Sequence, residues 1–173
     1  MELLYKNNSG ELWYDSEQNV LQMSWFNNVD LISFRNLFLK ANELIHANRI
    51  GRLVMDYRKL DDFTTSCLVW IKHDFMKPRG VGQNMIKKLK RFAIIKPNQT
   101  INHALNQVSI HFITRVFISK NIDLEYKSFY DHQKGLIWIT IQSNKVHFGI
   151  YHNSQKNFGQ FFLRLLGLRS TIR

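Results

Sequence analysis

RLVMDYRKLDDFTTSCL, residues 52–68, decides the fold of this 173-residue chain. The stretch begins with an apolar run at 53–55, turns polar at Asp56, and passes through Thr64, Thr65 and Ser66 into a segment with helical spacing of its apolar residues. In α/β domains a buried strand leads into a helix in this way. Ligands of open α/β sheets gather at the carboxyl ends of strands, so we expect any functional group near Asp56.

The composition is that of one soluble globular domain, with 45% hydrophobic and 21% charged residues. No apolar run of about 18 residues is present, so we expect no membrane span. The N-terminus lacks the pattern of a secretory signal, and the single cysteine, Cys67, excludes an intrachain disulfide. We therefore expect a cytoplasmic protein.

The net charge of +11 is unevenly distributed along the chain. Residues 1–74 carry slightly more acidic than basic side chains, whereas residues 75–122 and 132–173 contain no acidic residue at all. Two basic blocks favour a localised anionic partner over uniform solubilising charge.

Two strands and a helix are expected before residue 52. Residues 11–15 and 20–26 alternate as strands do, and Leu21, Met23 and Trp25 are expected to face the core. Apolar residues at spacings of three and four then predict a helix to about Ala47; these are Leu31, Phe34, Leu37, Phe38, Ala41, Leu44 and Ile45.

After Asp56 the pattern predicts alternating helices and strands. We expect a loop at 59–62, a helix that ends before Pro78, and a loop over 77–91 with two glycines and a basic end. A buried strand is expected at 92–95, and a helix is expected from about Asn98 to Lys120.

The last part of the domain can be interpreted in two ways. A strand is plausible at 124–129. The β-branched residues of 136–141 favour a hairpin with 146–148. Asp131 is a good helix N-cap, which instead favours a helix over 132–143. A short apolar helix is a candidate at 157–168.

This order of elements resembles the STAS or SpoIIAA-like family, which includes anti-sigma-factor antagonists and many uncharacterised bacterial proteins. Three local matches carry the resemblance: Asp56 followed by the turn 64–68, the strand 91–96 after a glycine-containing loop, and 128–131 followed by 135–139. The third match favours the helix over 132–143. The resemblance covers about residues 11–143 and implies a mixed central sheet of about five strands flanked by helices.

In the antagonist branch of this family, a serine of the turn is phosphorylated by a partner kinase. The resemblance carries that role to Thr65, with Ser66 beside it, as candidate phospho-acceptors. A phosphate at a helix N-terminus is physically reasonable, because free backbone N–H groups and the helix dipole favour negative charge. Thr64 and Cys67 depart from the family's turn at both flanks. The simpler interpretation is that Thr64, Thr65 or Ser66 caps the following helix.

The first basic block also contains the candidate anion-binding residues. They are Lys77, Arg79, Lys87, Lys88, Lys90 and Arg91. Such a segment either contacts phosphate groups or is a solvated loop. Nucleic-acid or other polyanion binding through 77–91 and the C-terminal tail is the alternative hypothesis. Aromatic residues do not interleave with these charges as a single-strand binding platform would require, so such binding would rest on phosphate contacts alone.

No spacing of residues predicts a catalytic triad, a cofactor loop or a metal site. Cys67 and the seven histidines lack the grouping that a hydrolase needs, and His147 and His152 lack further metal ligands. We therefore expect no catalytic residue, no cofactor and no metal.

The sequence as a whole predicts a SpoIIAA-like α/β domain over residues 1–143. Residues 144–173 form a basic, apolar C-terminal extension that is expected to pack on the domain or on a partner. The expected function is that of a non-enzymatic regulatory or binding module. Its partner would be a regulatory protein, a small anionic or apolar ligand, or a second copy of the chain.

Overall fold

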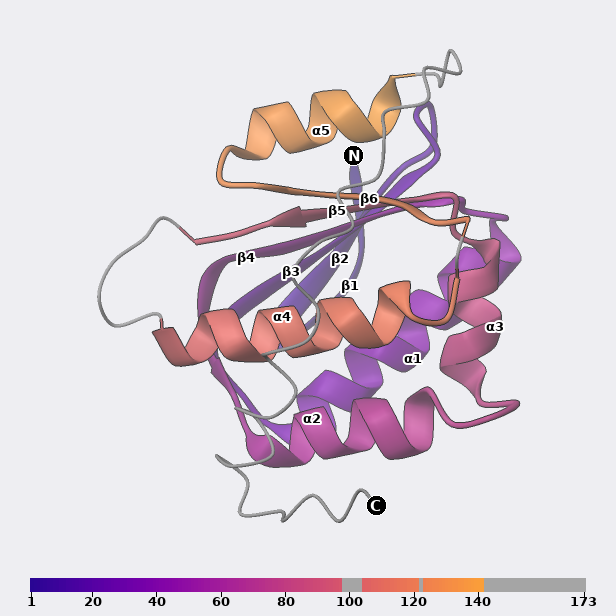
Figure 1. Cartoon of the computed structure of the whole chain (residues 1–173). Coiled ribbons are helices and arrows are strands. Elements are labelled where there is room, and N and C mark those ends of the chain that lie inside the picture. Colours follow the sequence, from indigo (N-terminus) through magenta and orange to yellow (C-terminus); the bar gives the residue numbers. More distant parts are fainter. Residues whose placement is uncertain (98–103, 122, 142–173) are drawn as a thin grey trace, which may run out of the picture. The chain divides into compact units, whose positions relative to one another are not determined.

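The computed structural model describes residues 1–97, 104–121 and 123–141, all of which belong to one compact unit, Met1–Ile141. The unit is an α/β fold in which helices cover a single sheet (Figure 1). The predicted extension at 144–173 and the predicted helix at 157–168 lie outside the described residues. In chain order the elements are β1 (Glu2–Asn7), β2 (Gly10–Asp15), β3 (Val20–Val29), α1 (Leu31–Ala47), β4 (Arg52–Phe63), α2 (Thr65–Trp70), the π-helical segment η1 (Ile71–Phe75), α3 (Val81–Lys88), β5 (Arg91–Ile95), α4 (Ala104–Ile118), β6 (Glu125–Phe129) and α5 (His132–Thr140).

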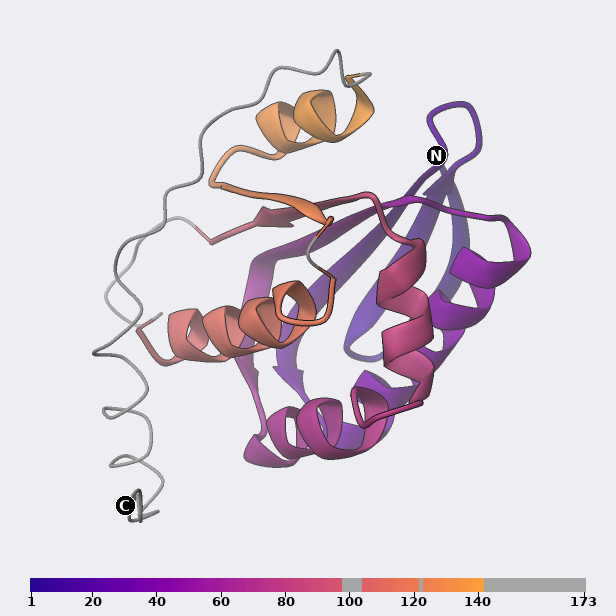
Figure 2. The same ribbon diagram turned by 45° about the vertical axis from the view of Figure 1, so that its right-hand side comes forward.

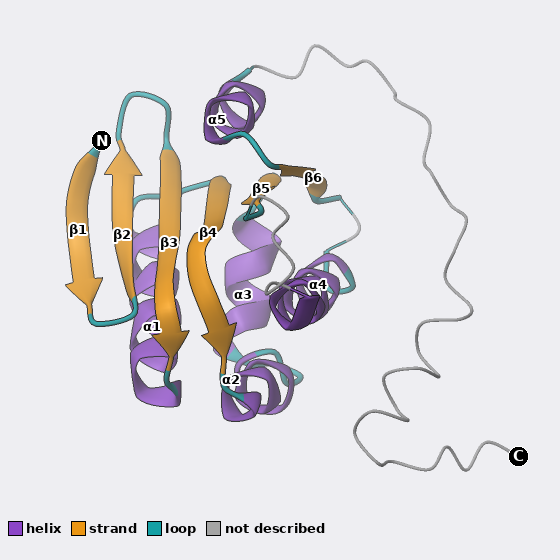
Figure 3. Cartoon of the chain, turned by 90° about the vertical axis from the view of Figure 1, so that its left-hand side faces the viewer, coloured by secondary structure: helices purple, strands orange, loops and turns teal. Residues whose placement is uncertain are grey.

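The sheet has six strands in the order β1-β2-β3-β4-β5-β6 (Figure 3). The first three strands are antiparallel neighbours, and β3 to β6 are parallel. The predicted mixed sheet flanked by helices is therefore confirmed. It gains β1, which the sequence analysis did not expect because three apolar residues in a row, Leu3, Leu4 and Tyr5, do not alternate with polar ones.

The helices between the parallel strands all lie on one face of the sheet. Each new strand is added on the same side of the previous one, and right-handed crossovers then place every connecting helix on the same face. Figure 2 shows α1, α2, α3 and α4 below the sheet and α5 above it. This arrangement divides the molecule into a large core and a small one.

The large core lies between the sheet and α1 to α4. Leu21, Met23 and Trp25 of β3 face it, as the sequence predicts, and so does the apolar stripe of α1. Trp25 packs against Phe34 and Phe63 with ring centroids 5.2 and 5.3 Å apart. Offset and edge-to-face aromatic pairs of this kind add to the free energy gained from burial alone.

The small core lies under α5, on the opposite face. Its buried members come from three strands, β3, β4 and β5, and from α5. They are Val20, Val54, Ala93, Ile95 and Ile139. The helical interpretation of 132–143 is therefore confirmed for His132–Thr140. Tertiary burial of one apolar face outweighs the strand propensity of the β-branched residues.

The predicted loop at 59–62 is wrong, because those residues lie within β4. The strand continues as far as Phe63 by pairing with the end of β3, and two register shifts accommodate the extra residues. Leu60 and Phe63 enter the large core beyond the first shift. Bulges of this kind were not visible in the sequence because they break the alternation on which strand prediction depends.

The predicted loop over 77–91 is also wrong in its central part, which forms α3. The sequence did not predict this helix, because Gly80 and Gly82 disfavour helix formation. Met85 and Ile86 are buried, and their burial stabilises the helix. Gly82 is itself required, because a Cβ there would overlap the ring of Phe75 and lie 2.6 Å from Met76 Sδ.

The Gly82→Ala variant separates helix propensity from packing. Propensity alone predicts a gain of about 1 kcal/mol, since alanine favours a helix. We expect instead a loss of about 1–3 kcal/mol in the free energy of unfolding, because the Phe75 ring is held among other aromatic rings and cannot move freely. Urea denaturation measures the change.

The matched control is Gly51→Ala, whose Cβ would meet no atom closer than 3.8 Å. It should change stability by less than about 0.5 kcal/mol. If Gly82→Ala were more stable than the wild-type chain, α3 would not pack against Phe75 as described.

Candidate functional site

The strand-to-helix junction presents its hydroxyl groups to solvent. Thr64 occupies the N-cap position of α2, but its side chain makes no bond to a backbone amide there. Its Oγ1 lies 2.9 Å from Ser66 Oγ and 3.1 Å from Cys67 Sγ. Thr65 and Ser66 are both exposed in the first turn of α2. Their role as phospho-acceptors stays a prediction.

Asp56 lies beneath α5 rather than in an open cleft. Its carboxylate is almost buried and receives a two-pronged contact from Arg58, at 3.0 Å from Nε and 2.6 Å from Nη2. The backbone N–H of Arg58 donates to the same carboxylate. The pair raises the pKa of the Arg58 guanidinium, mainly through its hydrogen bonds to Asp56. Asp56 thus serves the structure of β4, and it lies within the strand rather than at its end, because β4 continues to Phe63.

His132, the first residue of α5, joins this polar cluster from above. Its Nε2 lies 3.0 Å from Gln22 Oε1 on β3 and 3.9 Å from the carboxylate of Asp56. Partial burial lowers the pKa of His132, and the nearby positive charge of Arg58 lowers it further. The carboxylates of Asp56 and Asp131 act in the opposite direction. At neutral pH the neutral imidazole ties the start of α5 to the sheet.

Arg91 holds the other end of α5. Its guanidinium donates to the backbone carbonyls of Trp138 and Ile141, and it lies 5.5 Å from the centre of the Trp138 ring. Its Nε also donates to Glu125 Oε2 at 2.8 Å. A cation at a helix C-terminus is favourable, so Arg91 fastens α5.

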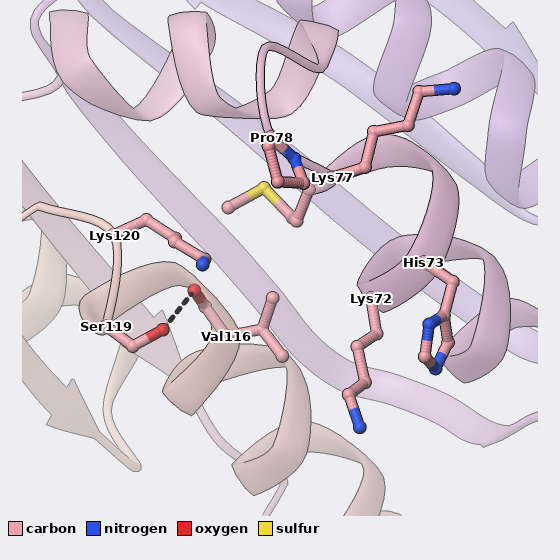
Figure 4. Close-up of a pocket in the computed structure, with 8 residues that line it drawn as sticks. Lys72, His73, Lys77, Pro78, Val116, Ser119 and Lys120 are labelled. Atoms are coloured by element: carbon pink, nitrogen blue, oxygen red, sulfur yellow. Dashed lines mark hydrogen bonds between the residues drawn. The ribbon is translucent and has the colours of Figure 1, made fainter.

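A hollow of about 330 Å³ opens where η1 and the loop after it approach the end of α4 (Figure 4). Among the described residues its lining combines basic and apolar groups, with the nearly buried Met76 at the floor, and contains no carboxylate. The lining residues are Lys72, His73, Met76, Lys77, Pro78, Val116, Ser119 and Lys120.

The lysine side chains that line the hollow point in different directions. Figure 4 shows Lys120 extending toward Val116 and Pro78, whereas the ammonium group of Lys77 points away from the others. Ser119 Oγ donates to the Val116 carbonyl at 3.0 Å, which leaves its lone pairs as acceptors at the rim. Lys120 is therefore best placed to contact a ligand inside the hollow.

The structure separates the six residues predicted to bind anions. Lys77 lines the hollow, and Arg79 is exposed just before α3. Lys87 and Lys88 lie in the last turn of α3, roughly 10 Å along the helix from its start. Lys90 is exposed after them. Arg91 does not share their surface, because it is buried at the end of α5. For the other five the anion-binding role stays a prediction.

Sequence reasoning missed most of the hollow. Lys72 and His73 precede the basic block and were not considered, and Lys120 was treated only as a helix end. Val116, Ser119 and Lys120 are spaced by three and four, so their shared helix face could have been recognised. The approach of η1 to α4 could not, because it depends on tertiary packing.

Comparison with solved structures finds similar chains, and one of them is an uncharacterised bacterial protein. The chain resembles an uncharacterised protein from Shewanella loihica PV-4, a member of the DUF3478 family with a SpoIIAA-like fold, at 16% identity and a TM-score of 0.49. The match covers 79% of this chain and 98% of that one. No family model and no curated protein sequence matches. At this identity the similarity concerns the fold alone and indicates no ligand, partner or reaction.

The part of the chain that the structure describes contains neither a metal-binding cluster nor a membrane-spanning helix. Within it, no cluster of three or more histidine, cysteine, aspartate or glutamate side chains could hold a metal ion. No described helix is both long enough and apolar enough to span a bilayer.

The pH dependence of stability tests the His132 contact. The unfolded chain titrates at this histidine near pH 6.5, and the folded chain titrates below it, so protons bind preferentially to the unfolded form. The stabilisation is complete above about pH 6.5 and is lost as the pH falls. We expect the difference in unfolding free energy between the wild type and His132→Gln to shrink from pH 8 to pH 5.

The control is His46→Gln, which replaces an exposed histidine in the last turn of α1. The difference in unfolding free energy between the wild type and His46→Gln should not shrink from pH 8 to pH 5. Denaturation at a series of pH values measures both variants, and an unchanged difference for His132→Gln would exclude the imidazole as the source.

Proposed function

We propose that the protein is a non-enzymatic binding module that takes a small anionic ligand with an apolar part in the hollow between η1 and α4. The observation that carries the proposal is the lining itself, in which three lysines and one histidine lie around apolar side chains and no described carboxylate takes part. Hollows of this size match the lower end of the range for small-molecule sites.

The surrounding charge supports an anion rather than a neutral ligand. Residues 75–122 contain nine basic and no acidic residues. Lys77 and Lys120 of this stretch line the hollow, whereas Arg91 lies under α5 on the other face of the sheet. Such a concentration of one sign raises the local concentration of an oppositely charged ligand and its rate of association.

The apolar floor supports a ligand that is more than a bare ion. Met76 is almost buried, and Pro78 and Val116 add apolar surface beside it. A phosphate or carboxylate head near Lys120 would place its apolar part against these residues. Burial of that part would contribute about 25 cal/mol per Å² of apolar surface.

The described residues offer little support for catalysis. Burial raises the pKa of the Cys67 thiol, which disfavours the nucleophilic thiolate. His132 and Asp56 lie on the opposite side of the sheet from the hollow, beneath α5. The hollow itself contains His73 and Ser119, but Ser119 Oγ donates to the Val116 carbonyl rather than to the imidazole, which favours binding over reaction.

Octyl phosphate is a suitable probe, because it combines a phosphate head with an apolar chain. We expect it to bind more tightly than inorganic phosphate, and Lys120→Ala to weaken its binding about three- to tenfold. Isothermal titration calorimetry at low ionic strength measures both affinities.

The matched control is Lys88→Ala, which removes an exposed lysine at the other end of α3. It should leave the affinity for octyl phosphate unchanged within about twofold. Equal losses in both variants would point to diffuse electrostatics. Tight binding of a DNA oligomer with a steep salt dependence, and no binding of either phosphate, would replace the proposal by the nucleic-acid hypothesis.

A further inference from the structure

β6 forms one outer edge of the sheet, opposite β1 (Figure 3). One side of β6 pairs with β5, and no described strand pairs with the other side. Glu125, Tyr126 and Lys127 are all exposed. An edge strand of this kind presents free backbone groups that another strand can extend.

The direction of these backbone groups follows from the bonds to β5. Glu125 N–H donates to the Lys90 carbonyl, and the Phe129 carbonyl accepts from Lys96 N–H. In parallel pairing alternate residues bond the same neighbour, so Glu125, Lys127 and Phe129 turn their backbone groups toward β5. Tyr126 and Ser128 turn theirs outward.

The side chains of β6 make its edge self-complementary. We propose that β6 pairs in antiparallel fashion with β6 of a second copy of this chain, about a two-fold axis beside Tyr126. In that register the two Tyr126 residues exchange both backbone hydrogen bonds, and each Glu125 lies directly across from the Lys127 of the other copy. Opposite charges at directly opposed positions stabilise strand pairs, and the symmetry provides the contact twice.

Neighbouring registers are less favourable. An axis beside Lys127 would oppose two lysines, which repel each other. An axis beside Ser128 would satisfy the backbone but would place each Lys127 across from a Phe129. The register at Tyr126 is the one that satisfies both the backbone groups and the charges.

The surroundings of β6 are compatible with this pairing. Arg91 bonds Glu125 through Oε2, and the Glu125 side chain is still 50% exposed, so Oε1 can accept from a lysine of the other copy. Tyr126 is 41% exposed and adds aromatic area on the opposite face. The other edge is less suited, because β1 has a register shift between Leu3 and Tyr5, and such irregularities protect edges from pairing.

The first test is the mass of the full chain in solution. A five-residue strand buries little area, so the dimer should be weak and dependent on concentration. Light scattering after gel filtration, loaded from about 1 to about 200 µM, should show the mass rising from monomer toward dimer. Lys127→Glu should raise the dissociation constant of the dimer about tenfold, because each Glu125 would then lie across from a glutamate of the other copy.

Lys87→Glu is the matched control, because it makes the same charge change on an exposed residue of α3. It should leave the dissociation constant unchanged. A monomer throughout the concentration range, or equal effects of the two substitutions, would overturn the proposal.

The second test reads the register directly. In the proposed pairing the Cα atoms of Tyr126 in the two copies lie about 5.5 Å apart, within the range of a disulfide. Tyr126→Cys should therefore form a covalent dimer under mild oxidation, while the native Cys67 is buried. Ser128→Cys would place its thiols about 14 Å apart along the strands and should not cross-link. Cross-linking of Ser128→Cys alone would exclude the register.

Discussion

The parallel pairing of β3 with β4 is the interaction on which the rest of the structure depends. It joins the antiparallel β1–β3 part of the sheet to the parallel part, and it extends from Val20 and Arg52 to Val29 and Phe63. Both strands bury side chains on both faces near their starts, because Leu21 and Leu53 enter the large core while Val20 and Val54 enter the small one. A one-residue slip in this pairing would turn the core side chains of one strand to the wrong face of the sheet.

The two faces of the sheet are stabilised by different means. The face under α1 to α4 has a large apolar core in which aromatic rings predominate, whereas α5 covers only a small apolar group. The second face adds polar contacts at both ends of the helix, through His132 at its start and Arg91 at its end. These contacts fix the direction of α5, which so few apolar residues would not specify alone.

The sequence was informative where burial produces a simple period. The stripe of α1 and the inward face of β3 follow from periods of 3.6 and 2, the strand at 92–95 follows from its continuous apolar run, and each was predicted correctly. Prediction failed where tertiary contacts override local preference. The extension of β4 depends on bulges opposite β3, and α3 depends on the fit of Gly82 against Phe75. The charge pattern located the basic face, but Lys72 and Lys120 meet only because η1 packs near α4.

Asn121 lies in the chain between the basic hollow and the edge of β6. Asn121 follows α4, and its side chain donates to the carbonyls of Ile86 and Leu89 at the end of α3, at 2.9 and 3.0 Å. Lys120 on one side of it and Glu125 on the other are thus held in one hydrogen-bonded frame. A ligand shifts an equilibrium only if it binds two conformations differently, and the structure describes one arrangement of these hydrogen bonds. Binding in the hollow therefore need not alter the pairing of β6, and each can be lost by substitution without loss of the other.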